Sequence, residues 1–255
     1  MNLFDLTGMT AVVVGGTSSL GAAMAEGLAA HGAGVAVVGR HPGRVREVLD
    51  RIAHINGDYR YIRADATSDA DLRGVLNEVW QWRGRIDVLI NCPGTNSATP
   101  FFDVTMEEWD HIMDVNLKSY VRSCQIFGRH MCDHGRGGSI INVSSVSSGP
   151  PLSKVFSYSA AKSGINSITQ FLARELAPFG VRVNAVIPGF FPTDQNRELL
   201  TDERRRAILA HTPMARFGDP QELQGVAVWL ASPRASGFVT GALIRVDGGF
   251  GAMTI

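Results

Sequence analysis

The sequence predicts one α/β domain over residues 1–255, a doubly wound, seven-stranded parallel sheet with helices on both faces. Short apolar runs with strand character alternate with longer stretches of helical periodicity, which is typical of such a sheet. The chain has 255 residues, of which 45% are hydrophobic, enough for one sizeable core. No linker, repeat or low-complexity segment indicates a second domain.

Strands are expected where apolar residues run together between turn-forming residues. The first such run is Ala11-Val12-Val13-Val14, whose continuous apolar character indicates a buried strand. In chain order the strands are expected at residues 10–14, 35–38, 59–63, 88–91, 139–144, 181–187 and 243–246. Helices are expected at residues 21–31, 43–55, 69–83, 106–134, 156–179, 201–210 and 220–231.

Glycines and polar residues follow the strands at the points where they end. Gly15 follows the first expected strand, Gly39 and Arg40 the second, Asp65 the third, Asn91 the fourth, Ser145 the fifth and Pro188 the sixth. Open parallel sheets bind ligands outside the carboxyl ends of their strands. We therefore expect these residues to surround one binding site.

A glycine-rich turn connects the first strand to the first helix. It reads Gly15-Gly16-Thr17-Ser18-Ser19-Leu20-Gly21. A turn of this kind lets backbone N–H groups and a helix N-terminus meet a pyrophosphate. Taken alone, the turn has a conformational explanation as well, because glycine is common in tight turns.

Tyr158 and Lys162 are four residues apart, which places them one turn apart on the same face of a helix. A cation beside a phenol lowers a pKa that is ordinarily near ~10, so the pair can act as an acid or base. Ser145 ends the strand-like run Ser139–Ser145 and lies upstream of Tyr158, so a loop and a helix can bring both hydroxyls to one substrate oxygen. The alternative for the pair alone is a surface tyrosine stacked over a lysine stem.

These features together resemble the short-chain dehydrogenase/reductase family over essentially the whole chain. The resembling motifs occur in the family's order: Gly15 to Gly21, Asp65-Ala66, Asn91-Cys92-Pro93-Gly94, Asn116, Ser145, Tyr158 with Lys162, Pro188-Gly189 with Thr193, Pro213 to Pro220, and Val246-Asp247-Gly248-Gly249. The resemblance implies a Rossmann-type fold. Four positions depart from the family pattern: Val14 replaces a threonine, Ser19 replaces a glycine, and Cys92-Pro93 replaces an Asn-Ala pair.

The resemblance implies hydride transfer between a carbonyl or alcohol carbon and a nicotinamide. Tyr158 would be the general acid in reduction and the general base in oxidation. Ser145 would hydrogen-bond the substrate oxygen, and Lys162 would hold the nicotinamide ribose and depress the Tyr158 pKa. Asn116 would position water in a proton path towards Lys162. The alternative for Asn116 is a polar residue that kinks the long helix 106–134.

The resemblance also implies the residues that bind the cofactor. They are Gly15, Thr17, Ser18, Ser19, Leu20, Gly21, Arg40, Asp65, Ala66, Asn91, Gly94, Tyr158, Lys162, Pro188, Gly189 and Thr193. An NAD-selective site usually has an acidic residue near position 39, and here that residue is glycine. Arg40 can pair with a 2′-phosphate, so NADP(H) is preferred. NAD(H) remains possible, with Arg40 stacked on the adenine.

Within the family, the chain looks most like oxidoreductases of sugar acids such as gluconate, mannonate or fructuronate. The expected substrate-binding residues are Ser145, Asn96, Phe190, Asn196 and Arg197. Arg197 would form a fork on a substrate carboxylate. Alternatively, Arg197 pairs with Glu198 or Asp194 on a surface loop.

Two other functions stay open. A 3-oxoacyl-thioester reductase would need a basic patch for an acidic carrier, which Arg122, Arg129 and Arg136 offer only weakly. A non-catalytic dinucleotide-binding protein would not need Tyr158. By family resemblance we expect a homotetramer, with helices 106–134 and 156–179 pairing with their copies through small residues such as Ala160, Ala161 and Gly164.

Composition narrows the range of partners. The formal net charge is zero, so the chain offers no electrostatic case for nucleic acid or an anionic membrane. Cys92, Cys124 and Cys132 have no CxxC spacing and suit reduced thiols in a cytoplasmic protein. His130 and His134 flank Cys132 on a helix, but no third or fourth ligand is indicated, so no metal is expected. No apolar run is long enough to span a membrane, and no signal peptide is expected.

Overall fold

In the part of the chain that the structure describes, seven parallel strands form one sheet in the order β3-β2-β1-β4-β5-β6-β7. The structure is a computed structural model that describes residues 2–40, 42–55, 57–192 and 201–252, excepting the side chains of 42–45. The strands are β1 (Thr10–Val14), β2 (Gly34–Gly39), β3 (Tyr59–Arg63), β4 (Val88–Asn91), β5 (Gly138–Val143), β6 (Val181–Pro188) and β7 (Leu243–Val246). The predicted fold class is confirmed, and each strand lies within one residue of its predicted bounds.

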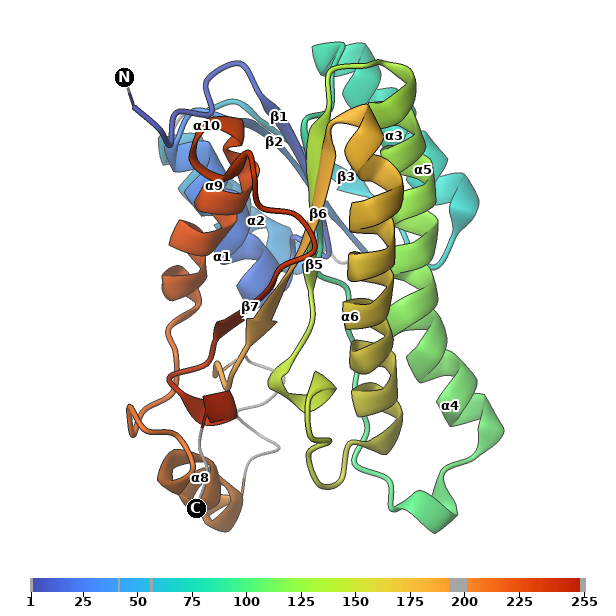
Figure 1. Ribbon diagram of the computed structural model, residues 1–255, viewed down its shortest axis with the longest axis vertical. Helices are drawn as coiled ribbons and strands as arrows, with labels where there is room; N and C mark the ends of the chain where they lie inside the picture. Colours follow the sequence, from blue (N-terminus) through green and yellow to red (C-terminus); the bar gives the residue numbers. More distant parts are fainter. Residues whose placement is uncertain (1, 41, 56, 193–200, 253–255) are drawn as a thin grey trace.

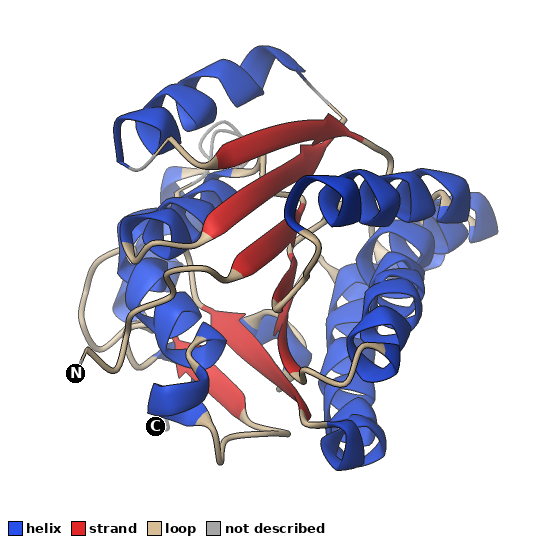
Figure 2. Cartoon of the chain, turned by 90° about the horizontal axis from the view of Figure 1, so that it is seen from above, coloured by secondary structure: helices blue, strands red, loops and turns tan. Residues whose placement is uncertain are grey.

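Helices cover both faces of the sheet (Figures 1 and 2). One face carries α1 (Ser19–Ala30), α2 (Pro42–Ile55) and α9 (Gln224–Ala231), and the other carries α3 (Asp69–Arg83), α5 (Ser119–Asp133) and α6 (Phe156–Leu176). Each layer has its own buried apolar cluster against the sheet. None of the described helices combines the length and the apolar character needed to cross a lipid bilayer.

The helical periodicity of the sequence explains which side of a helix meets the sheet. On α5, Cys124, Phe127 and Met131 recur at spacings of three and four residues and are all buried. α1 differs, because nearly all of its residues from Gly21 to Ala29 are buried. It lies between the sheet, α2 and α9, and its small residues let these elements approach closely.

The predicted helix 106–134 is interrupted. It consists of α4 (Met106–Met113), a π-helical turn η2 (Asp114–Lys118) and α5. The predicted helices 156–179 and 220–231 likewise end or begin in 3₁₀ turns, η4 (Ala177–Phe179) and η5 (Pro220–Leu223). The remaining described elements are α8 (Asp202–Ala210), α10 (Pro233–Ser236), η1 (Phe101–Asp103), η3 (Val146–Ser148) and η6 (Phe250–Ala252).

The strand order reverses direction at β1, which lies between β2 and β4. Connections leave on opposite faces at this point, so a crevice opens outside the carboxyl ends of β1 and β4. The glycine-rich turn follows β1 directly, and Gly15 has φ +79. A Cβ at Gly15 would lie 2.6 Å from the carbonyl carbon of Cys92, just beyond β4. Glycine is therefore required here by both backbone conformation and space.

We expect Gly15→Ala to destabilise the protein by at least about 1 kcal/mol, because a side chain is strained in the left-handed region and would clash with Cys92. The matched control is Gly74→Ala on α3, where a Cβ would meet nothing within 4 Å. There alanine should stabilise the helix by about 0.5–1 kcal/mol. Urea denaturation of both variants measures the difference, and equal effects would contradict the requirement at Gly15.

Candidate active site

Ser145 and Tyr158 meet at the carboxyl edge of the sheet. Ser145 follows β5 as the N-cap of η3, where its Oγ accepts hydrogen bonds from the Ser147 N–H at 3.2 Å and the Ser147 hydroxyl at 3.0 Å. Tyr158 lies in the first turn of α6, and the Ser145 side chain is near enough to its phenol to lower the phenol's pKa. The structure thus brings together the two hydroxyls that were predicted to share one substrate oxygen.

Lys162 is buried one turn after Tyr158, with 3% of its surface exposed. Its Nζ donates to the Val143 carbonyl oxygen at 2.8 Å and to the Tyr120 hydroxyl at 3.1 Å. It lies 5.5 Å from the centroid of the Tyr158 ring. The ammonium is therefore held between β5 and α5, beside the phenol rather than hydrogen-bonded to it in the described contacts.

Burial controls the titration of both groups. It raises the pKa of Tyr158 to about 12, although the hydrogen bond with Ser145 acts in the opposite direction. It lowers the pKa of Lys162 to about 8. Burial sets the direction of the shift for Tyr158, and the lowering of its pKa by Lys162 stays a prediction. The phenol is protonated at neutral pH and is suited to donate a proton.

Asn116 lies in the π-helical turn and fixes the loop after β4. Its Nδ2 donates to the carbonyl oxygens of Thr95 and Ile112, both at 2.9 Å, and its Oδ1 accepts from the Thr95 N–H at 3.1 Å. The residue thus interrupts the helix and also holds the chain next to Gly94. These contacts agree with the alternative of a polar residue that interrupts the long helix, and the water path towards Lys162 stays a prediction.

The glycine turn places the N-terminus of α1 in the crevice. Ser18 is the N-cap: its hydroxyl donates to the Gly15 carbonyl oxygen at 2.8 Å and accepts from the Gly21 N–H at 3.2 Å. Ser18 Oγ also lies 3.6 Å from Cys92 Sγ, so one departure from the family pattern packs against the turn. Thr17, Ser19 and Leu20 are half-buried within the turn and the start of α1.

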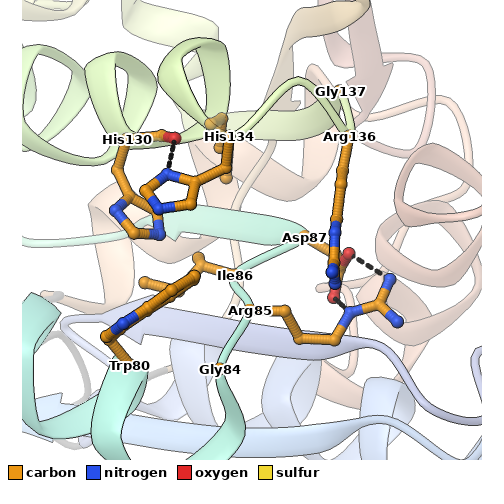
Figure 3. Close-up of a pocket in the computed structure, with 10 residues that line it drawn as sticks. Trp80, Gly84, Arg85, Ile86, Asp87, His130, His134, Arg136 and Gly137 are labelled. Atoms are coloured by element: carbon orange, nitrogen blue, oxygen red, sulfur yellow. Dashed lines mark hydrogen bonds and ion pairs between the residues drawn. The ribbon is translucent and has the colours of Figure 1, made fainter.

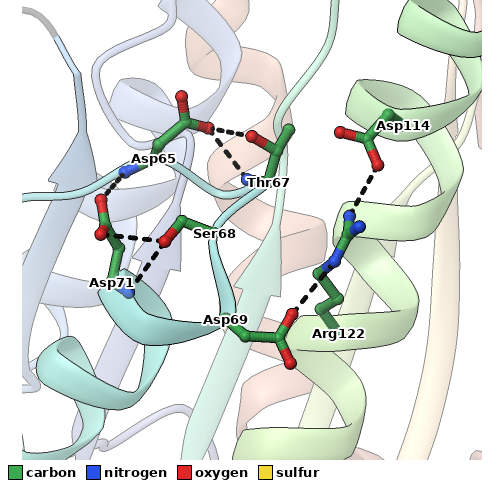
Figure 4. A network of polar contacts seen from close by, with 7 residues as sticks. All are labelled: Asp65, Thr67, Ser68, Asp69, Asp71, Asp114 and Arg122. Carbon is green, nitrogen blue, oxygen red and sulfur yellow. Dashed lines mark hydrogen bonds and ion pairs between the residues drawn. The ribbon is translucent and has the colours of Figure 1, made fainter.

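The residues after β2 and β3 meet at the edge of the crevice. Arg40 Nη1 lies 3.7 Å from Asp65 Oδ2, with both side chains partly exposed. Asp65 also accepts from the Thr67 N–H at 2.9 Å and its hydroxyl at 2.8 Å (Figure 4). Burial raises the pKa of Asp65, but these bonds and Arg40 outweigh it and the pKa is lowered. Ala66 packs against the core behind them.

Gly39 explains why an acidic residue is absent at the end of β2. A Cβ at this position would lie 2.5 Å from Thr17 Oγ1. An acid could enter only if the side chain of Thr17 moved or were removed. The two positions are therefore linked, and together they leave Arg40 as the charged group nearest the end of the strand.

Asn91 does not turn its side chain into the crevice. It is fully buried, and its Nδ2 donates to Asn142 Oδ1 at 2.9 Å and to Cys124 Sγ at 3.4 Å. These contacts tie β4 to β5 and α5. Gly94 is exposed and borders Asn116, so the backbone of the Asn91-Cys92-Pro93-Gly94 segment faces the site while the Asn91 amide stabilises the sheet.

A cavity of about 410 Å³ lies past the ends of β6 and β7. Phe190 lines it and packs edge-on against Phe250, with ring centroids 5.2 Å apart. Pro188 and Gly189 end β6 beside it, and a Cβ at Gly189 would lie 2.7 Å from Asp247 Cα. Asn96 is exposed on the loop after β4, where its Oδ1 accepts from the Ser97 N–H at 2.9 Å. Thr193, Asn196 and Arg197 lie outside the described residues.

Several residues near the site were not predicted from the sequence. Tyr120 holds the Lys162 ammonium and also hydrogen-bonds the Pro93 and Val143 carbonyls at 3.0 Å each. Its position one turn after Asn116 on the same helix was the available signal. Arg204 of α8 donates to the Ser153 carbonyl oxygen at 3.2 Å and so connects α8 to the loop that precedes Tyr158. Arg245 lines the cavity past β7.

Arg122 is committed to contacts within the chain. It lies 3.1 Å from Asp69 and 2.9 Å from Asp114 (Figure 4). Gly164 likewise faces its own chain, since a Cβ there would lie 2.8 Å from Leu117 Cδ2. The small residue thus lets α6 approach the π-helical turn of its own chain, and its part in pairing with a second copy stays a prediction.

Known proteins resemble the chain over nearly its whole length. A family model described as enoyl-(acyl carrier protein) reductase matches residues 14–251. The 2-dehydro-3-deoxy-D-gluconate 5-dehydrogenase of Escherichia coli (strain K12) is 35% identical over 251 residues, which cover 98% of each chain. A solved structure from Agrobacterium tumefaciens, provisionally identified as a gluconate dehydrogenase, has 34% identity and a TM-score of 0.94, and the match covers 100% of both chains.

The chain belongs to the short-chain dehydrogenase/reductase family. A second Agrobacterium tumefaciens structure, provisionally a 2-deoxy-D-gluconate 3-dehydrogenase, has bound NADP, 35% identity and a TM-score of 0.92, and the match covers 99% of this chain and 100% of that one. The family resemblance inferred from the sequence is confirmed. As a short-chain dehydrogenase/reductase, the protein is an NAD(P)-dependent oxidoreductase acting on CH–OH groups.

The buried Lys162 should make stability depend on pH. Its pKa is about 8 in the folded protein and near 10.5 in the unfolded chain, so between these values the unfolded chain binds more protons than the folded one. The free energy of unfolding therefore rises with pH between these two pKa values. The cost of burying the charged lysine is fully present below about pH 8. We expect the unfolding free energy of wild type relative to Lys162→Met to increase by roughly 1–2 kcal/mol from pH 7.5 to 9.5. Urea denaturation at both pH values measures it, and a flat difference would contradict the depressed pKa.

Proposed function

We propose that the protein interconverts a secondary alcohol and a ketone of a sugar acid, with NADP(H) as its preferred cofactor. The observation that carries the proposal is the contact of Tyr158 with Ser145 beside the buried Lys162, at the sheet edge that holds the glycine turn. The sugar-acid class is supported by the relatives that act on, or are provisionally assigned to, gluconate-type compounds.

The residues present fit a dinucleotide. The Gly15 position leaves no room for a side chain, the N-terminus of α1 opens at the turn, and Ser18 caps it. Bare backbone next to a helix N-terminus suits a pyrophosphate. The nicotinamide, when bound, supplies or accepts the hydride, and Lys162 would hold its ribose.

The chain's own residues would transfer the proton at the substrate oxygen. Tyr158, protonated at neutral pH, donates to the substrate oxygen during reduction, and Ser145 hydrogen-bonds the same oxygen as negative charge develops. Lys162 donates to the Tyr120 hydroxyl and to the Val143 carbonyl, and its ammonium lies beside the Tyr158 ring. Asn116 acts as a positioning residue that fixes Gly94 and Thr95 beside the site.

The domain organisation, the cellular location and the oligomeric state belong to the same proposal. We infer one domain over residues 1–255, a cytoplasmic location and a homotetramer. Phe171 and Phe179, each about half exposed at 55% and 54%, offer apolar surface at the outer end of α6 for such an assembly. Light scattering at micromolar concentration would show a monomer if the assembly is wrong.

A 3-oxoacyl-thioester reductase is the second candidate, favoured by the name of the matching family model. That function needs a basic surface for an acidic carrier, and Arg122 is already paired with Asp69 and Asp114. A non-catalytic dinucleotide-binding protein would have no use for a phenol and an ammonium buried together, because burial disfavours the charged lysine.

Tyr158→Phe should lower turnover at least about 100-fold, because one positioned proton donor is removed, while the Kd for cofactor changes little. Tyr59→Phe is the matched control, a phenol on β3 away from the site. Both are assayed with sugar acids and with acyl thioesters, following reduced nicotinamide by absorbance. Turnover of Tyr158→Phe near wild type would refute the catalytic assignment, and activity confined to thioesters would refute the sugar acid.

The cofactor preference depends on Arg40. We expect wild type to use NADPH with a higher kcat/KM than NADH, and Arg40→Ala to lose about ten-fold or more with NADPH alone, since a charge-assisted hydrogen bond to phosphate is lost. Arg60→Ala is the control, an arginine on β3 that pairs with Glu78 at 3.8 Å. Equal use of NADH by wild type would overturn the preference. Because of the contact with Thr17, Gly39→Asp should favour NADH only together with Thr17→Gly.

A further inference from the structure

A second cavity lies at the amino-terminal edge of the sheet, opposite the candidate active site. Its volume is about 110 Å³, and it is bordered by the C-terminal ends of α3 and α5 and the starts of β4 and β5. The side chains that line it come from Trp80, Arg85, Ile86, Asp87, His130, Met131, His134 and Arg136 (Figure 3). None of these residues takes part in the proposed reaction.

Two imidazoles stack in this cavity. His130 and His134 are one turn apart on the same face of α5, and their ring centroids are 4.0 Å apart with an interplanar angle of 31°. Both rings lie against the Trp80 indole, with centroid distances of 4.8 and 4.4 Å. Figure 3 shows the two imidazoles together above the indole. Histidines at i and i+4 on one helix face form a metal-chelating arrangement.

The hydrogen bonds leave one nitrogen of each ring available. His134 Nδ1 lies 2.8 Å from the His130 carbonyl oxygen, and because a carbonyl only accepts, Nδ1 carries the proton and Nε2 the lone pair. Metal-binding histidines are commonly oriented by such a bond from the second nitrogen. His130 Nε2 is buried and has no hydrogen-bond partner among the described residues. A buried polar atom without a partner is unfavourable, and a ligand would supply the missing partner.

The acidic group that lines the cavity already has partners within the chain. Asp87 accepts from Arg85 at 2.6 and 2.8 Å and from the Thr10 N–H at 2.8 Å, so its carboxylate is occupied. The C-terminal ends of α3 and α5 carry partial negative charge that favours a cation between them. Arg136 lines the outer, exposed part of the cavity and opposes a cation there. Burial and the neighbouring His134 lower the pKa of His130, while Asp133 acts against them.

We propose that His130 and His134 form a two-imidazole binding site for a divalent transition-metal ion that prefers nitrogen ligands, such as Ni²⁺, Cu²⁺ or Zn²⁺. The metal–nitrogen bonds, about 2.0–2.1 Å long, would form at the ring edges, because the nitrogen lone pairs lie in the ring planes. Water completes the coordination, because no group of three or more ligating side chains is found within the described part of the chain. The sequence did not predict this site, since it shows neither the unpaired nitrogen nor the cavity.

The test is calorimetric titration of the untagged protein with Ni²⁺, which does not oxidise thiols as Cu²⁺ does. We expect one ion to bind per chain, and His134→Gln to weaken binding at least ten-fold. His134 is exposed, so its loss should leave the fold intact, which the melting temperature without metal verifies. His31→Gln is the matched control: His31 Nδ1 makes the same bond, 2.8 Å from the Gly27 carbonyl on α1, and this variant should bind as wild type does.

Two further variants locate the ion. Cys132→Ser should retain full affinity, because the thiol lies between the histidines in sequence but outside the stacked rings. Bound Ni²⁺ should quench part of the tryptophan emission, and Trp80→Phe should remove that part. The proposal is overturned if wild type shows no saturable binding, if His134→Gln binds as tightly as wild type, or if affinity is lost with Cys132→Ser instead.

Discussion

The burial of the Lys162 ammonium is the constraint around which the candidate active site is built. A charge of this kind is expensive to remove from water unless polar groups surround it. The Val143 carbonyl at the end of β5 and the Tyr120 hydroxyl on α5 supply those groups. The Lys162 ammonium thereby connects α6 to the sheet and to α5. These contacts fix the start of α6, where Tyr158 lies one turn earlier and close to Ser145. The Lys162 pKa of about 8 shows that these hydrogen bonds offset only part of the lost hydration.

The candidate active site and the pair of histidines lie at opposite edges of the parallel sheet. Its carboxyl edge gathers the turn after β1, the loop held by Asn116 and the start of α6, because every parallel strand ends on that side. Its amino edge gathers helix C-termini instead, and there the imidazoles of His130 and His134 meet against Trp80. A ligand at one edge is therefore separated from a ligand at the other by the length of the strands.

The ion pair at the edge of the crevice, after β2 and β3, is weak. Arg40 faces Asp65 at 3.7 Å, a long contact between two partly exposed groups, which contributes little to stability. A phosphate dianion offers Arg40 a stronger partner than this carboxylate. The hydrogen bonds from Thr67 keep Asp65 ionised and in place without Arg40, so the arginine can change partners at small cost.

The sequence by itself determined the order of strands and helices, the fold class and the family, because these follow from local apolar periodicity and short motifs. β1, β3, β4 and β7 have the bounds that their apolar runs predicted. The tertiary structure alone decided what depends on residues far apart in the chain. Tyr120 reaches Lys162 across 42 positions, and Gly164 lies against Leu117. Burial raises the Tyr158 pKa despite the neighbouring lysine, and the π-helical turn leads Asn116 to Thr95. Hydration and packing are properties of the assembled core, and spacing along the chain does not contain them.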